Sequence, residues 1–238
     1  MKQIEHLKVK IFADGADRSG MIEMYEKSFI KGLTTNPTLM RKAGIKDYRS
    51  FCKDILTVIN DKPLSFEVFS DDFEEMERQA MEIASWGDNV YVKIPVTNTK
   101  QIPAYDLVKK LSHQNVKLNV TALMTLDQVR NVVNAMASGV PGYVSVFAGR
   151  IADTGRDPIP VMASAVKELE KRPEVELIWA SPRELLNIFH ADEVGCHIIT
   201  VTNDILKKLS LVDYDLDEYS LDTVKMFHND ANAAGYNL

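Results

Sequence analysis

The chain is poor in cysteine, has no long apolar run and carries no excess of basic residues. Its 238 residues include two cysteines, Cys52 and Cys196, which are too few for a disulfide framework and lack metal-site spacing. No stretch approaches the roughly 18 apolar residues of a membrane span, and the amino-terminal segment MKQIEHLKVKIF lacks the apolar core and cleavage site of a signal peptide. We therefore expect a soluble, cytoplasmic protein with no membrane partner.

Charge and motif content exclude further classes. The chain has 28 Lys and Arg against 34 Asp and Glu, and a net charge of −6 disfavours nucleic-acid binding, which depends on neutralising phosphates. The five histidines form no HExxH or comparable ligand pattern, and no Walker or Rossmann glycine motif occurs. These absences disfavour a zinc mechanism and the common nucleotide-binding sites. A local cationic pocket for a small anionic molecule is still compatible with this composition.

What the sequence does have is a regular alternation of short apolar runs with longer amphipathic stretches, which is typical of repeated βα units. The carboxyl ends of the runs lie about 27 residues apart, close to one βαβ unit of roughly 30 residues. This pattern predicts a single (β/α)8 TIM-barrel domain over 1–238, with 219–238 as a C-terminal helical extension. A doubly wound open sheet would show the same alternation. The eight predicted strands are residues 9–13, 31–34, 64–69, 90–94, 117–120, 143–147, 176–179 and 197–201.

In such a barrel the active site forms where the strands end, so polar residues there are candidates for chemistry. Lys93 lies in the apolar run VYVKIP (90–95). Desolvation of an ammonium favours loss of its proton, and the neutral amine that results is the nucleophile of Schiff-base enzymes. The alternative is a lysine whose stem lies along the barrel and whose head reaches water or a structural carboxylate.

Two carboxylates lie on predicted strands, one at the end of the first strand and one inside the third. Asp14 follows IFA (11–13), and strand alternation places Glu67 on the same face as Ser65. Near a buried lysine they could carry the proton transfers of carbonyl chemistry. Otherwise Asp14 caps a loop and Glu67 is the counter-ion of Lys93. Asn119 and Thr121 share one face of the fifth strand, where they could equally be satisfied polar core residues.

Arginines after the sixth and seventh strands indicate an anion site. Arg150 follows VFAG (146–149), and Arg183 lies in the first turn of a helix predicted to begin at Ser181. Barrels often hold phosphate in this region, so a phosphorylated substrate would suit both. The alternative for each is a surface salt bridge.

Three segments together resemble the transaldolase family, which includes the fructose-6-phosphate aldolases. They are GLTTNPT (32–38), VKIP (92–95) and NVTA (119–122), in the family's order on strands two, four and five. The resemblance implies a (β/α)8 barrel that uses a Schiff-base lysine on strand four and needs no cofactor or metal. It also implies transfer of a dihydroxyacetone unit from a ketose phosphate, sedoheptulose 7-phosphate or fructose 6-phosphate, to an aldose phosphate in the pentose phosphate pathway.

The resemblance assigns a role to each matching residue. Lys93 matches the Schiff-base lysine, and Asp14 matches the acid–base residue. Asn36 and Asn119 match the amides that orient the lysine and the dihydroxyacetone part of the substrate, and Glu67 and Thr121 match the pair that holds the catalytic water. Ser145 matches a residue that binds a substrate hydroxyl. The residues that match the phosphate-binding positions are Arg150, Arg183 and Ser181. Near Ala180 the chain departs from the family pattern Ala-Ser-Phe-Arg, because it lacks the phenylalanine and the loop is expected to be shorter.

Residues at two positions favour transfer over simple cleavage. The aldolases of the family usually have glutamine where this chain has Glu67 and tyrosine where it has Phe147. A fructose-6-phosphate aldolase that releases free dihydroxyacetone is the alternative, followed by a deoxyribose-phosphate-type aldolase and a catalytically silent sugar-phosphate-binding barrel. The short-chain members imply a homo-oligomer, a pentamer or a decamer of two stacked pentamers, in which the terminal helix packs on a neighbour.

Overall fold

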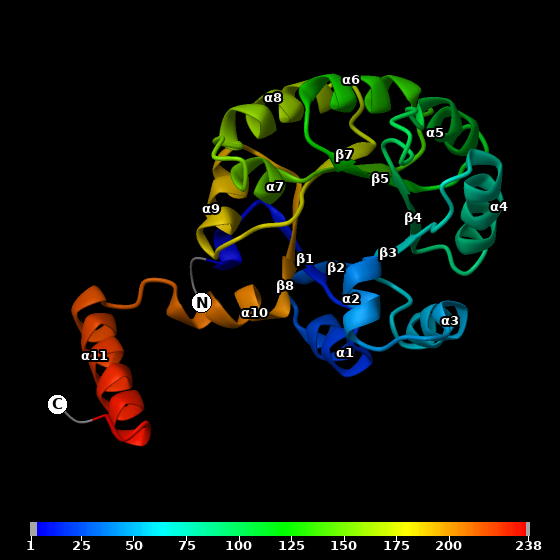
Figure 1. Ribbon diagram of the computed structural model, residues 1–238. Coiled ribbons are helices and arrows are strands. Elements are labelled where there is room, and N and C mark those ends of the chain that lie inside the picture. The colour runs from blue at the N-terminus through cyan, green and yellow to red at the C-terminus, as the bar shows by residue number, and fades with distance from the viewer. Residues whose placement is uncertain (1–3, 237–238) are drawn as a thin grey trace.

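Eight parallel strands close into a barrel in the computed structural model, which describes residues 4–236 (Figure 1). Neighbouring strands pair in chain order, and β1 closes the ring against β8, from Lys10 opposite Ile198 to Asp14 opposite Thr202. The predicted (β/α)8 barrel is confirmed, and the open sheet is excluded because β1 and β8 would then be unpaired edges. The strands are β1 (Lys10–Asp14), β2 (Ile30–Thr34), β3 (Leu64–Glu67), β4 (Val90–Pro95), β5 (Leu118–Leu123), β6 (Gly142–Val146), β7 (Val175–Trp179) and β8 (Ile198–Thr202).

Helices follow the strands and cover the outside of the ring (Figure 1). Each buries an apolar face against the strands; the helix after β3, for example, buries Met76, Ala80 and Ile83 at helical spacing. Thr125 and Gln128 form a capping box at the start of the helix after β5. These helices are α1 (Arg18–Glu26), α2 (Pro37–Lys42), α3 (Tyr48–Val58), α4 (Phe73–Ala84), α5 (Tyr105–Ser112), α6 (Leu126–Ala135), α7 (Ala148–Ala152), α8 (Ile159–Leu169), α9 (Leu186–Glu193) and α10 (Asn203–Leu206), with 3-10 turns η1 (Ile4–His6) and η2 (Lys207–Leu211).

Aromatic rings fill the barrel interior on the amino-terminal side of the polar strand ends. Tyr91 stacks on Tyr143 with ring centroids 4.0 Å apart, and Phe12 meets Tyr143 edge-on at 5.8 Å. Gly32 is required beside them, because a Cβ at this position would lie 2.5 Å from the Phe12 ring. Tyr91 and Tyr143 each stand two residues before a predicted site residue of the same strand. The rings therefore form a floor beneath the candidate site.

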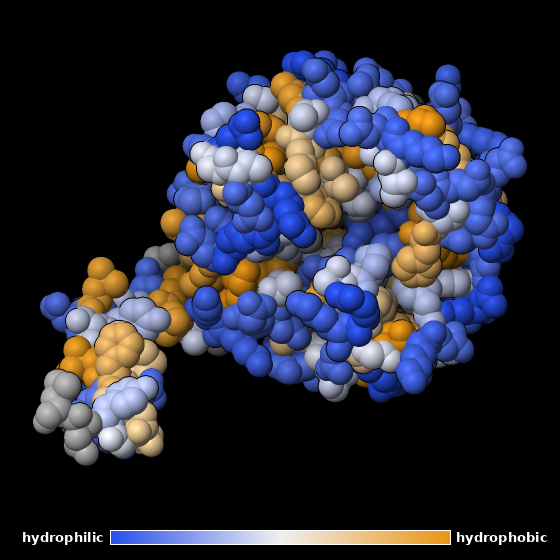
Figure 2. All heavy atoms as spheres, in the orientation of Figure 1, coloured by the Kyte–Doolittle hydropathy of each residue, from blue (hydrophilic) through white to orange (hydrophobic). Residues whose placement is uncertain are grey.

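The last helix, α11 (Leu216–Ala233), projects away from the barrel, and none of its residues is buried (Figure 1). The predicted extension thus begins a few residues earlier than expected, and its residues 237–238 lie outside the described part of the chain. Apolar side chains gather on this helix, as the orange and tan spheres of Figure 2 show. Leu216 is 80% exposed, and Val224 and Phe227 are each 61% exposed. Among residues 4–236, no helix has both the length and the apolar character that a bilayer crossing requires.

Candidate active site

Lys93 occupies the middle of β4 between the fully buried Val92 and Ile94, and its side chain is only 11% exposed. Glu67 is its register partner on β3. The Lys93 Nζ donates a hydrogen bond to Glu67 Oε1 at 2.9 Å and another to the carbonyl of Thr35. A buried ion pair is tolerated only when further hydrogen bonds compensate for lost water. Glu67 is thus the counter-ion of Lys93, and it also lies where it can take the proton that the amine must lose before attacking a carbonyl.

The second carboxylate oxygen of Glu67 is surrounded by hydroxyls. Thr35 Oγ1 approaches Glu67 Oε2 at 3.0 Å and also lies within hydrogen-bonding distance of the Ser65 carbonyl. The Tyr48 hydroxyl, from the first residue of α3, lies 3.2 Å from the same Glu67 oxygen and accepts the Glu67 N–H at 2.7 Å. These contacts hold the carboxylate in one orientation beside the amine.

Asp14 ends β1 and is held by residues of the neighbouring strand end. Thr34 Oγ1 donates to Asp14 Oδ1 at 2.8 Å, and Asn36 Nδ2 donates to Oδ2 at 3.1 Å. Because the Thr34 hydroxyl donates its one hydrogen bond to Asp14, the Thr200 hydroxyl is the donor in the short hydrogen bond between Thr34 and Thr200. The Asn36 oxygen caps α2 by accepting the Leu39 N–H, which explains the Asn-Pro sequence at this turn.

The environment of Asp14 shifts the pKa of its carboxyl upward. Burial raises the pKa of Asp14 above its ordinary value of 3.8, and the negative charge of Glu67 adds to this effect. The positive charge of Lys93 and the hydrogen bonds from Thr34 and Asn36 act in the opposite direction without cancelling it. A carboxylate with a raised pKa binds a proton more readily, which suits a general base.

A chain of hydrogen bonds crosses the interior from β6 to β3. Ser145 Oγ donates to Asn119 Oδ1 at 2.7 Å, and Asn119 Nδ2 donates to Ser65 Oγ at 3.0 Å. All three residues are buried. Asn119 is also the register partner of Lys93 on β5, so this amide is fixed directly beside the lysine strand.

Thr121 lies further along β5, at an irregularity. The pairing of β5 with β6 shifts register after Val120, and Ala122 has a φ of 64°. Such a shift redirects the side chains that follow it. Thr121 pairs with Pro95 and is half-buried at the rim of the same strand end.

Arg150, Ser181 and Arg183 form a separate group after β6 and β7. The helix predicted from Ser181 is wrong: α9 begins at Leu186, so Arg183 lies in the preceding loop. Ser181 has a φ of 62°, which a helix cannot contain, and its hydroxyl accepts from Arg183 Nη1 at 3.1 Å instead. Arg183 also donates from Nε to Asp153 Oδ1 at 2.8 Å, while Arg150 is exposed on α7.

A glycine on α7, Gly149, allows the loop that contains Ser181 and Arg183 to pack closely against this helix. A Cβ on Gly149 would lie 1.6 Å from the Ser181 carbonyl oxygen, so no other residue fits without moving the loop. The positions of Ser181 and Arg183 therefore depend on Gly149. A cationic surface of two guanidiniums, one of them already paired with a carboxylate, can bind an anion.

The strand ends thus bring most predicted residues into one connected cluster, while the arginine group forms a second. Sequence reasoning missed five residues that complete the cluster: Thr34, Thr35, Ser65, Thr200 and Tyr48. Thr34 ends β2, and Thr35 follows it. Ser65 and Thr200 lie within β3 and β8, whereas Tyr48 begins α3. The strand positions were a signal in the sequence, and Tyr48 had none. Within residues 4–236, no group of three or more His, Cys, Asp or Glu side chains lies close enough to hold a metal ion.

A family model described as transaldolase/fructose-6-phosphate aldolase matches residues 11–238. The chain belongs to this family. It is 33% identical over 202 residues to a protein of Dehalococcoides mccartyi named "Probable transaldolase", covering 84% of this chain and 90% of that one. It is also 33% identical over 218 residues to a "Probable transaldolase" of Thermoanaerobacter sp. (strain X514), covering 91% and 95%. Membership of this family indicates a transaldolase-type aldolase or transferase.

A solved structure of 2,3-dimethylmalate lyase, a PEP mutase/isocitrate lyase superfamily member, is similar in fold. Its TM-score is 0.54 at 12% identity, over 99% of this chain and 87% of that chain. At this identity the likeness concerns the fold alone.

Proposed function

We propose that the protein is a transaldolase that transfers a dihydroxyacetone unit between sugar phosphates through a Schiff base on Lys93. The observation that carries this proposal is the buried Lys93–Glu67 pair, with Nζ 2.9 Å from Oε1, at the carboxyl ends of β4 and β3. A lysine buried beside a proton acceptor can be converted to a neutral nucleophile. A structural role alone does not account for the convergence of Asp14, Asn36 and Asn119 on the same interior.

The first half of the reaction forms the imine. Lys93 gives a proton to Glu67, and its nitrogen attacks the ketone carbon of a ketose phosphate to give a carbinolamine. Protonation of the carbinolamine hydroxyl, with Glu67 as the donor and Thr121 helping to hold a water, lets that oxygen leave as water. The protonated imine that forms can accept the electron pair of an adjacent breaking bond.

The second half cleaves and re-forms a carbon–carbon bond. Asp14 takes the C4 hydroxyl proton, the C3–C4 bond breaks, and its electron pair moves into the imine to give a three-carbon enamine while an aldose phosphate leaves. The enamine then attacks a second aldehyde, Asp14 returns the proton to the new hydroxyl, and water releases the product ketose. Asn36, Asn119 and Ser145 bind the dihydroxyacetone hydroxyls, and Arg150, Arg183 and Ser181 bind the phosphate.

Substrates and setting follow from the family resemblance and complete the proposal. The donors are sedoheptulose 7-phosphate or fructose 6-phosphate, glyceraldehyde 3-phosphate is an acceptor, and the reaction belongs to the pentose phosphate pathway. A cytoplasmic setting agrees with Cys52 and Cys196 being free, buried thiols.

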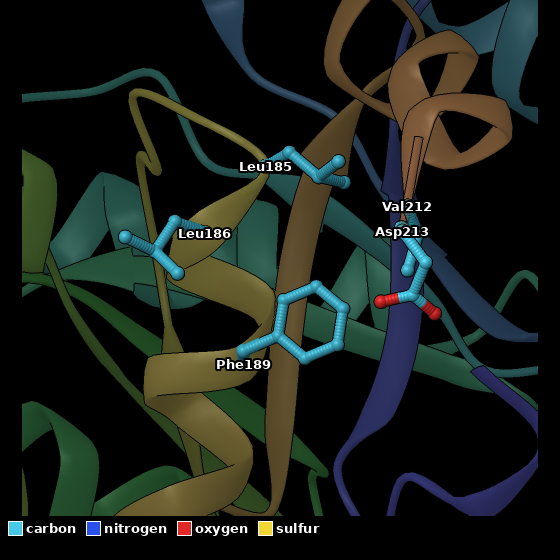
Figure 3. A pocket seen from close by; sticks show the side chains of 5 residues that line it. All are labelled: Leu185, Leu186, Phe189, Val212 and Asp213. Atoms are coloured by element: carbon cyan, nitrogen blue, oxygen red, sulfur yellow. The ribbon is translucent and has the colours of Figure 1, made fainter. Parts of the chain in front are cut away.

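A homo-oligomer is also part of the proposal. The exposed apolar residues of α11 need a partner surface. An apolar pocket lies at its base, lined by Leu185, Leu186, Phe189, Val212 and Asp213, with Leu186 and Phe189 on α9 (Figure 3). This pocket contains none of the residues of the Lys93 cluster. We assign it to assembly rather than to chemistry.

Trapping of the imine tests the mechanism. Borohydride is added to the protein with fructose 6-phosphate, and the peptide that contains residues 90–95 is analysed by mass spectrometry. We expect a reduced three-carbon adduct on Lys93, and no adduct in Lys93→Met. An adduct on another lysine, or full carbon–carbon exchange activity in Lys93→Met, would contradict the proposal. Binding of fructose 6-phosphate by a protein that forms no adduct would favour the silent sugar-phosphate-binding barrel.

Product analysis separates transfer from cleavage. With fructose 6-phosphate alone, a transaldolase releases little free dihydroxyacetone, and it turns over when an aldose phosphate acceptor is added. A fructose-6-phosphate aldolase releases dihydroxyacetone at the same rate in both cases.

A further inference from the structure

The pairing of β2 with β3 stops one hydrogen bond short of its regular end. The Thr35 N–H donates to the Ser65 carbonyl at 3.2 Å. In a regular parallel ladder the Glu67 N–H would next donate to the Thr35 carbonyl. The Glu67 N–H donates instead to the Tyr48 hydroxyl at 2.7 Å, and the Thr35 carbonyl accepts from Lys93 Nζ. At the centre of the site, one regular hydrogen bond between main-chain groups is thus replaced by two hydrogen bonds to side chains, those of Tyr48 and Lys93.

Tyr48 is fixed in place by elements outside the barrel. It is the first residue of α3, whose N-cap Asp47 accepts the Ser50 N–H. Its ring packs edge-on against Phe69 with centroids 4.5 Å apart, and it lies 6.2 Å from the Trp86 ring. With the ring held in this way, the hydroxyl has little freedom to leave the Glu67 N–H.

The chemistry of the phenol suits this position. Burial raises the pKa of Tyr48, and the charge of Glu67 adds to the effect, so the hydroxyl keeps its proton. A neutral hydroxyl can accept the Glu67 N–H and donate at the same time. Glu67 Oε2 at 3.2 Å and the Glu67 carbonyl at 3.3 Å are its available acceptors.

We infer that Tyr48 is a positioning residue, whose hydroxyl replaces the Thr35 carbonyl as the acceptor for Glu67 and so leaves that carbonyl free to hold the Lys93 amine. The inference rests on the proposed function, because it assigns Tyr48 a part in the same imine formation. Without the hydroxyl, the buried Glu67 N–H has the Thr35 carbonyl as its regular ladder acceptor. The Lys93 amine and the Glu67 N–H then compete for the Thr35 carbonyl oxygen.

The test compares two Tyr→Phe variants that each remove one hydroxyl. Y48F keeps the ring and its packing, whereas Y25F removes a hydroxyl that donates to Asp61 on the exposed outside of the barrel. Imine formation is followed in single turnovers with saturating fructose 6-phosphate, quenched by borohydride, and the adduct on residues 90–95 is quantified. We expect Y48F to form the imine about tenfold more slowly with KM within twofold of the parent, and Y25F to be unchanged.

A double-mutant comparison shows whether Tyr48 acts through the pair it contacts. In an E67Q background, we expect the effect of Y48F on imine formation to shrink to less than twofold. A full tenfold effect in that background would overturn the inference. So would a Y48F protein that forms the imine at the parent rate and differs only in melting temperature or KM. In either case the parent's own adduct on Lys93 leaves the proposed function standing, whereas a parent with no adduct removes the proposed function itself.

Discussion

Single residues of this site combine roles that sequence reasoning treats as alternatives. Glu67 is the counter-ion of Lys93, and the same carboxylate lies where a proton acceptor is needed. Asn36 caps a helix with its oxygen and donates to Asp14 with its nitrogen. A polar side chain with two functional atoms can satisfy a structural and a catalytic requirement at once.

Asp14→Asn tests the base of the cleavage step. An amide cannot take the C4 hydroxyl proton, so we expect exchange activity to fall by roughly 10²- to 10⁴-fold while the imine still forms. Borohydride should then trap the intact six-carbon ketose on Lys93 rather than the three-carbon fragment. Trapping of the three-carbon fragment at the parent rate would exclude Asp14 as the base.

The pH dependence of the parent enzyme provides a second check on Asp14. Because burial raises the pKa of this carboxyl, the base becomes protonated at a higher pH than an ordinary aspartate would. We expect the rate of cleavage to fall as the pH falls through this raised pKa. A cleavage rate that stays constant down to the ordinary value of 3.8 would contradict this assignment.

Phe147→Tyr tests the preference for transfer. Phe147 is half-buried and packs against the aromatic floor, so its ring contributes no proton donor to the interior. A tyrosine hydroxyl can donate a proton to the enamine, which allows the three-carbon fragment to leave before an acceptor arrives. We expect release of free dihydroxyacetone without acceptor to rise by about 10²-fold. Unchanged release, measured by an enzymatic dihydroxyacetone assay, would remove Phe147 as a determinant.

At the scale of elements, strands were predicted well and loops were not. The polar residues Asp14, Glu67, Lys93 and Asn119 could be placed together because parallel strands of a barrel end at one rim. The helix from Ser181 failed because a serine followed by proline and glutamate also fits a loop with one left-handed residue. Tyr48 could not be found because its approach depends on where α3 packs, which no local pattern records.

Gly149→Ala tests the dependence of the arginine loop on one close approach. The added Cβ must displace the Ser181 carbonyl, and with it the loop that carries Arg183. Loss of a charged hydrogen bond to phosphate corresponds to about 1.5–3 kcal/mol, so KM for fructose 6-phosphate should rise roughly 10- to 100-fold. Unphosphorylated fructose serves as the internal control. An equal change in KM for both sugars would mean that this loop does not bind phosphate.

At the scale of the whole molecule, α11 is the one long element of residues 4–236 that has no buried residue. An amphipathic helix of 18 residues is stable in a protein mainly through the surface on which it packs. Nothing in the strand pattern specifies that surface. The extra helix was therefore predictable, but its position relative to the barrel was not.

Charges on the apolar face of α11 test the proposed assembly. We expect V224D/F227D to convert the oligomer to monomers in sedimentation experiments, because a buried unpaired carboxylate is strongly unfavourable. N229D, which adds one carboxylate on the polar face, should leave the oligomer intact. The monomers should still form the imine on Lys93. A parent protein that already sediments as a monomer would contradict the proposed homo-oligomer.

The acceptor that holds the Lys93 amine is a peptide carbonyl, and every amino acid supplies one at position 35. No substitution at position 35 can remove this carbonyl oxygen, whereas a substitution can remove a side-chain hydrogen-bond acceptor. The position of the carbonyl depends instead on the backbone of the turn between β2 and α2, at Asn36 and Pro37, and substitutions there can move it. In laboratory evolution of new aldol catalysts from this scaffold, any residue at position 35 would keep the carbonyl that holds Lys93, but only threonine or serine would keep a hydroxyl for Glu67. Libraries should therefore restrict position 35 to these two residues and leave that turn untouched.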